Sequence, residues 1–131
     1  MLKKTIKYFD FDGNEREEDF YFNLTRAEAI ELELGIEGGV EQYIKKITGD
    51  KDNRSIVDFF KDIILRSYGE KSADGKRFMK SAEISNGFAS TEAYSELFIE
   101  LTSSTEAATA FFNGIVPNVD KIAGTTVTAV E

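Results

Sequence analysis

The sequence predicts a mainly α protein with a small β part, an α+β fold in which an N-terminal β-hairpin precedes a bundle of about five to six helices. Two observations predict this class. Near the N-terminus, two strand-like stretches flank the turn residues Asp12-Gly13-Asn14. From residue 26 onward, apolar residues recur at steps of three and four, the spacing of one helix face. The 131 residues fit one domain, which we expect to span residues 1–117 and to precede a flexible tail over residues 118–131.

The hairpin should occupy residues 4–23, and its register has two alternatives. A two-residue turn at Asp12-Gly13 would set Thr5 opposite Phe20. A three-residue loop, with Asn14 in the left-handed conformation, would set Ile6 opposite Phe20. The second alternative also creates two opposite-charge pairs, Lys7 with Asp19 and Asp10 with Arg16. We therefore favour it, and we expect one apolar face to lie against helices or another chain. That face would gather Ile6, Tyr8, Phe20 and Phe22.

Six helices are predicted after the hairpin, from apolar spacing and from residues that commonly begin or end a helix. Their expected ranges are about 26–34, 39–48, 54–68, 81–87, 91–102 and 104–115. The first should begin with a capping box formed by Thr25 and Glu28. Its inward residues should be Ala27, Ile30 and Leu34.

The helix over residues 54–68 has the clearest amphipathic pattern. Its apolar side, which must be buried, consists of Ile56, Phe59, Phe60, Ile63 and Ile64. Asn53 or Ser55 can cap its start. Gly69 lies where helices often end in a left-handed residue. The polar residues 70–76, with Asp74-Gly75, predict a turn.

Six side chains on the last two helices are candidate partner-binding residues: Glu92, Glu96, Glu100, Phe111, Phe112 and Ile115. The three glutamates stand four residues apart, and no Lys or Arg in their helix offsets them. They form either a solvated acidic face or a docking stripe for a basic partner. The three apolar residues belong either to the core or to a patch kept for a partner.

The composition argues against several functional classes. A net charge of −8 does not suit a sequence-independent nucleic-acid binder. Without cysteine or histidine, the chain lacks thiol nucleophiles, thiolate ligands and the commonest general base, so we expect no enzyme, cofactor or metal site. A calcium loop beginning at Asp10 fails, because Glu15 and Tyr21 occupy the positions that need glycine and glutamate. No apolar run is long enough for a bilayer, so we expect a cytoplasmic protein.

Three segments carry a resemblance to a known family: EEDFYFNLTRAE at residues 17–28, SYGEKSADGKRF at residues 67–78, and STEAYSELFIEL at residues 90–101. They resemble tail assembly chaperones of long-tailed bacteriophages and prophages of Gram-positive bacteria. The resemblance spans roughly residues 1–117. It implies a protein without enzymatic activity that associates with the tape measure protein in the host cytoplasm, keeps it soluble, helps recruit tail tube subunits, and is absent from the finished virion.

Two other functions remain open at this stage. One is a structural tail or head-completion protein of the virion, and the other is an acidic phage-encoded regulatory module that binds a host protein. Charge is also uneven along the chain, since acids dominate from Glu83 onward and most lysines lie in the middle. Head-to-tail self-association between a basic middle and an acidic C-terminal region is a hypothesis that follows from this asymmetry.

Overall fold

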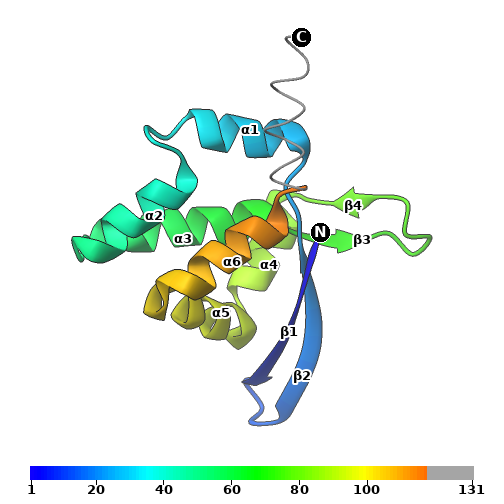
Figure 1. Ribbon diagram of the computed structural model, residues 1–131. Coiled ribbons are helices and arrows are strands. Elements are labelled where there is room, and N and C mark those ends of the chain that lie inside the picture. The colour runs from blue at the N-terminus through cyan, green and yellow to red at the C-terminus, as the bar shows by residue number, and fades with distance from the viewer. Residues whose placement is uncertain (118–131) are drawn as a thin grey trace.

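Four antiparallel strands and six helices make up residues 1–117, the part of the chain that the computed structural model describes (Figure 1). The strands are β1 (Leu2–Phe9), β2 (Glu15–Phe22), β3 (Tyr68–Lys71) and β4 (Phe78–Met79). The helices are α1 (Arg26–Leu34), α2 (Val40–Gly49), α3 (Asn53–Ser67), α4 (Ala82–Ala89), α5 (Glu92–Ser103) and α6 (Thr105–Ile115). The predicted α+β class is confirmed. The predicted tail, 118–131, lies outside the described residues.

The β1–β2 hairpin has a different register from both predicted alternatives. Ile6 lies opposite Glu18, and Phe20 lies opposite Lys4. Beyond the last strand pair, Phe9 with Glu15, the N–H of Asp10 donates to the carbonyl of Asn14 at 2.9 Å, so the loop has three residues, as expected. It consists of Phe11-Asp12-Gly13, however, and Gly13 rather than Asn14 takes the left-handed conformation, with φ of 83°. Glycine adopts positive φ without the steric cost that a Cβ atom adds, so the loop forms one residue earlier than predicted.

This register preserves the predicted apolar face, because it differs from the favoured one by two residues in pairing and side chains alternate with a period of two. Ile6 and Phe22 are buried, and Tyr8 and Phe20 are half-buried. Of the two predicted charge pairs, that of Arg16 with Asp10 is present at 2.6 Å. Lys7 pairs with Glu17, at 3.4 Å, instead of with Asp19.

The second hairpin, β3–β4, follows directly from α3 and was not predicted. The helix ends at Ser67, and Tyr68 already has extended backbone angles. Gly69 therefore belongs to a strand rather than to a left-handed helix end, and it pairs with Tyr21 of β2. A Cβ atom at Gly69 would lie 2.6 Å from the Phe78 ring, so the absence of a side chain lets that ring cover the strand.

The core centres on Phe22, which is fully buried where the sheet meets the helices. Its ring packs against those of Tyr68, Phe88 and Phe111, at centroid distances of 5.5, 5.7 and 5.3 Å. Helices α5 and α6 contact β1. The backbone N–H of Leu24, just after β2, donates to the carbonyl of Ile115 at 2.8 Å. The hairpin's apolar face is thus covered by the last two helices.

Helix α1 is oriented differently from the prediction. Ala29 is its buried residue, whereas Ala27 is exposed and 81% of Leu34 is accessible to solvent. The expected capping box is present, since Thr25 Oγ1 accepts from the N–H of Glu28 and the Glu28 carboxylate accepts from the N–H of Thr25. Of the expected inward residues, Ile30 is half-buried, but Ala27 and Leu34 were predicted wrongly. Only a small part of this short helix lies against the body (Figure 1), so apolar spacing did not decide its orientation.

Lys80 fastens the start of α1 to the sheet and to α3. Its Nζ donates to the Glu28 carboxylate at 2.8 Å and to the carbonyls of Asn23 and Arg66 at 2.9 and 3.3 Å. Burial raises the pKa of Glu28, but the hydrogen bonds from Lys80 and from the backbone of Thr25 outweigh burial and leave that pKa below its ordinary value.

The N-terminal cap of helix α3 is Asp52, whose carboxylate accepts from the N–H of Ser55. Neither predicted cap, Asn53 or Ser55, holds that position.

Candidate partner-binding surfaces

The acidic stripe of α5, defined as Glu92, Glu96 and Glu100, is exposed along its whole length. Thr91 caps the helix and accepts a hydrogen bond from the N–H of Tyr94. The helix itself contains no Lys or Arg, as the sequence shows, but the fold brings one cation from β1: Lys4 Nζ lies 2.7 Å from the Glu100 carboxylate. Glu92 and Glu96 have no ion pair with any residue in the described range. The side chain of Ile99 is also exposed on this helix. The stripe is therefore a charged surface with an apolar residue beside it.

The candidate residues of α6 lie in the core of the structure. Only 3% of Phe111 is exposed, and Phe112 and Ile115 are also buried. Phe111 meets the Phe22 ring edge-on, with an interplanar angle of 67°. The six candidates thus do not form one surface, since the glutamates face solvent and these three side chains face inward. A partner would touch the α6 residues only if that helix moved.

Two exposed phenylalanines at the turn end of the β1–β2 hairpin were not among the candidates. Phe9 is 61% exposed and Phe11 is 78% exposed. The Asp10 carboxylate holds the turn: it accepts from the N–H groups of Asp12 and Asn14, both at 2.9 Å, and from the Arg16 guanidinium. The bond from Arg16, together with those backbone bonds, lowers the pKa of Asp10. A phenylalanine in a turn, where Gly, Asn and Asp are preferred, was the sequence signal for this site.

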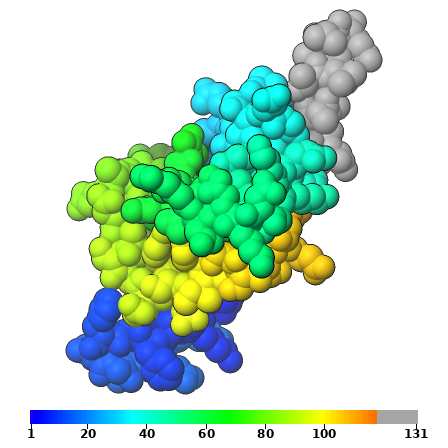
Figure 2. Space-filling view, turned by 90° about the vertical axis from the view of Figure 1, so that its left-hand side faces the viewer, coloured from blue at the N-terminus to red at the C-terminus, as the bar shows by residue number. Residues whose placement is uncertain are grey.

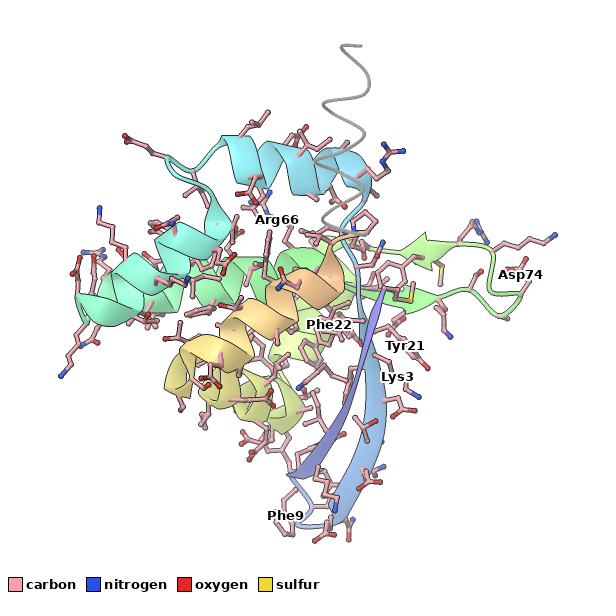
Figure 3. The ribbon with its side chains drawn as sticks, viewed as in Figure 1. Lys3, Phe9, Tyr21, Phe22, Arg66 and Asp74 are labelled. Carbon is pink, nitrogen blue, oxygen red and sulfur yellow. The ribbon has the colours of Figure 1, made fainter. Side chains whose placement is uncertain are left out.

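The β3–β4 hairpin carries positive charge on an otherwise acidic protein. Lys71 Nζ lies 4.2 Å from the centroid of the Tyr21 ring, a cation–π contact. Lys76 and Arg77 are exposed, and neither forms an ion pair with a residue of the described part. Asp74 instead holds the loop, accepting from Ser72 Oγ and from the N–H of Lys76, and these bonds lower its pKa. Figure 3 shows Asp74 at the far end of this hairpin and Phe9 at the end of the other.

Within residues 1–117, no group of three or more acidic side chains is arranged to hold a metal ion. None of the helices in that range combines the length and the apolar character that a membrane span requires. Over the same residues, each buried side-chain nitrogen or oxygen has a hydrogen-bond partner.

Comparison with known proteins gives one family. A family model described as "Phage tail assembly chaperone" matches residues 1–124, nearly the whole chain. No curated protein and no solved structure matches the chain.

Proposed function

Because the chain belongs to the phage tail assembly chaperone family, a family of assembly factors and not of enzymes, we propose that it binds the tape measure protein of a long-tailed phage or prophage of a Gram-positive host. It keeps the apolar stretches of that protein from aggregating and helps recruit tail tube subunits around it. The family match over residues 1–124 is the observation that carries this proposal. The chain acts in the host cytoplasm and is absent from the finished virion.

The proposed contact surface is the acidic stripe of α5. Glu92 and Glu96 have no ion-pair partner among residues 1–117, so they can pair with basic side chains of a partner, and Ile99 offers exposed apolar area next to them. Contact of this kind would cover apolar helix surface on the partner, while the acidic exterior keeps the complex in solution. Phe111, Phe112 and Ile115 would join the contact only in a state in which α6 leaves the core.

Co-expression with the tape measure protein encoded near this gene tests the proposal. We expect a larger soluble fraction of the tape measure protein and co-elution of the two chains. The stripe is tested with the triple variant Glu92→Gln, Glu96→Gln, Glu100→Gln. Less tape measure protein should co-elute with this variant than with the wild type, and the difference should be larger at low salt.

The matched control is a triple Glu-to-Gln variant at exposed positions outside the stripe: Glu31, Glu37 and Glu83. It removes the same charge and should behave as the wild type. Equal loss in both variants would mean that net charge, not the stripe, matters. If the tape measure protein aggregates with and without the wild-type chain, the proposal is wrong. Mass spectrometry of purified virions then tests the structural alternative, a tail or head-completion protein.

Self-association is a second part of the proposal. Copies of the chain would meet head to tail, an acidic surface of one against a basic surface of the next. In the form suggested by charge along the sequence, the acidic surface is the α5 stripe. Sedimentation of the stripe variant at low salt tests this form, which is wrong if the oligomer size does not change.

A further inference from the structure

Two hairpins project from the helical body in different directions and carry opposite charge. In Figure 1 the β1–β2 hairpin runs downward, whereas the β3–β4 hairpin points to the right. Figure 2 shows the β1–β2 turn protruding below the helices. Because their ends point away from each other, the two hairpin ends of one copy cannot meet. A contact between them needs a second copy.

The end of the first hairpin, here the acidic tip, combines exposed aromatic rings with carboxylates. It consists of Phe9, Phe11, Asp12 and Glu15. Asp12 and Glu15 form no ion pair with any described residue. Both rings are mostly exposed, and transferring an exposed apolar side chain into a contact is favourable.

The tip is also rigid before any partner arrives. The Asp10 carboxylate ties together the N–H groups of Asp12 and Asn14 and the side chain of Arg16. Positive φ at Gly13 completes the turn. Because the backbone of the turn is already ordered, docking through it costs less conformational entropy, so Phe11 is suited to anchor a contact.

The second hairpin, here the basic hairpin, has the matching properties. Its cations are Lys71, Lys76 and Arg77, and its apolar side chains are Phe78 and Met79. The cations outnumber its two carboxylates, exposed Glu70 and Asp74, and the Asp74 carboxylate is bound by Ser72 and the N–H of Lys76. Its Lys76 and Arg77 are exposed without an ion pair in the described range, and Met79 is exposed beside the half-buried Phe78 ring. Cations can stack on the faces of phenylalanine rings as well as pair with carboxylates.

We infer that the acidic tip of one copy docks on the basic hairpin of a second copy, with Phe11 against the apolar side chains and Asp12 and Glu15 against the cations. This inference rests on the proposed self-association and replaces its acidic surface, the α5 stripe, by the tip. Each copy carries one tip and one basic hairpin, so the contact is heterologous. Such a contact repeats from copy to copy and builds open chains or rings.

Sedimentation velocity of the full chain and of two variants tests the contact. The tip variant is Phe9→Ser with Phe11→Ser, and the hairpin variant is Lys76→Glu with Arg77→Glu. Exposed side chains contribute little to folding, so circular dichroism should be unchanged in both. The wild type should grow in mass with concentration at low salt, and each variant alone should associate at least about tenfold more weakly.

An equimolar mixture of the two variants is the decisive sample. The hairpin variant still has an intact tip and the tip variant still has an intact basic hairpin, so the mixture should form 1:1 dimers and nothing larger. Leu34→Ser, which removes another exposed apolar side chain, should associate as the wild type does.

Three results would overturn the inference. They are a wild type that stays monomeric, oligomers that both variants retain, and a mixture that stays monomeric. If only the stripe variant of α5 disrupts association, self-association stands but this contact is wrong. None of these results bears on tape measure binding, which the co-expression experiment measures separately.

Discussion

Replacing Phe111 by alanine should lower the free energy of unfolding by about 3–5 kcal/mol, the usual cost of removing a buried phenylalanine. The ring is 97% buried, and its edge-on contact with Phe22 accounts for about 0.5–1.5 kcal/mol of that loss. Domains of this size have free energies of unfolding of about 5–15 kcal/mol. The variant therefore stays folded only if the wild type's free energy of unfolding clearly exceeds this loss. Urea denaturation followed by far-UV circular dichroism measures the change. Phe111→Leu leaves a smaller cavity, so its free energy of unfolding should lie between those of the wild type and of Phe111→Ala.

Phe11→Ala is the matched control, because it makes the same chemical change at a ring that is 78% exposed. Its free energy of unfolding should differ from that of the wild type by less than about 0.5 kcal/mol. If Phe111→Ala proved as harmless as Phe11→Ala and yet lost the partner, the assignment of Phe111 to the core would be refuted. The α6 residues would then belong to a docking patch.

Three further outcomes follow from the contacts of the fold. Lys80→Met should lower the free energy of unfolding by about 1 kcal/mol, since three hydrogen bonds are lost but the site is partly screened by solvent. Urea denaturation midpoints measure this change. Glu28 has a lowered pKa, so its contribution is fully present above its ordinary value of 4.5 and disappears as pH falls through the lower folded-state pKa. The difference in unfolding free energy between wild type and Glu28→Gln should therefore be constant near neutral pH and shrink in acid, and a constant difference would contradict the assigned ion pair. Gly69→Ala should cost about 1–3 kcal/mol through its clash with Phe78, whereas Gly87→Ala, in a helix with open space around it, should be neutral or stabilising.

The sequence predicted the helices well, because their signals are local. Apolar spacing and capping residues such as Thr25 and Ser104 act within a few positions of each other. The orientation of α1 was not predictable in this way, since Ala27, Ile30 and Leu34 match the helical period equally well whether they face the body or solvent. The contacts that fix the helix come from distant parts of the chain, such as the hydrogen bond from Lys80 to Glu28.

The predicted register of the β1–β2 hairpin was wrong for a related reason. The observed and favoured pairings place the same side chains on the same face, so the apolar pattern cannot distinguish them. The choice lies in the turn, between Gly13 and Asn14, both residues that tolerate positive φ. Strand β4 has two residues and exists only through its pairing with β3, and so it leaves no pattern of its own.

For the candidate surfaces, exposure was the missing information. Sequence spacing identified the α5 stripe, and the structure places it in solvent. The same spacing cannot tell a core phenylalanine from an interface phenylalanine, so Phe111 remained ambiguous until its burial was known. The two hairpin ends carry no periodic pattern, and their projection from the body is a property of the whole fold.

The hydrogen bond between Leu24 and Ile115 has a consequence for synthesis. Translation proceeds at roughly 5–20 residues per second, so roughly 5–20 s separate the appearance of the first hairpin from that of the helix that closes over it. During this interval Ile6 and Phe22 lack the α5 and α6 surfaces that bury them, and contacts so distant along the chain form slowly. The nascent chain thus exposes, for a time, the kind of apolar surface that makes other chains depend on a chaperone.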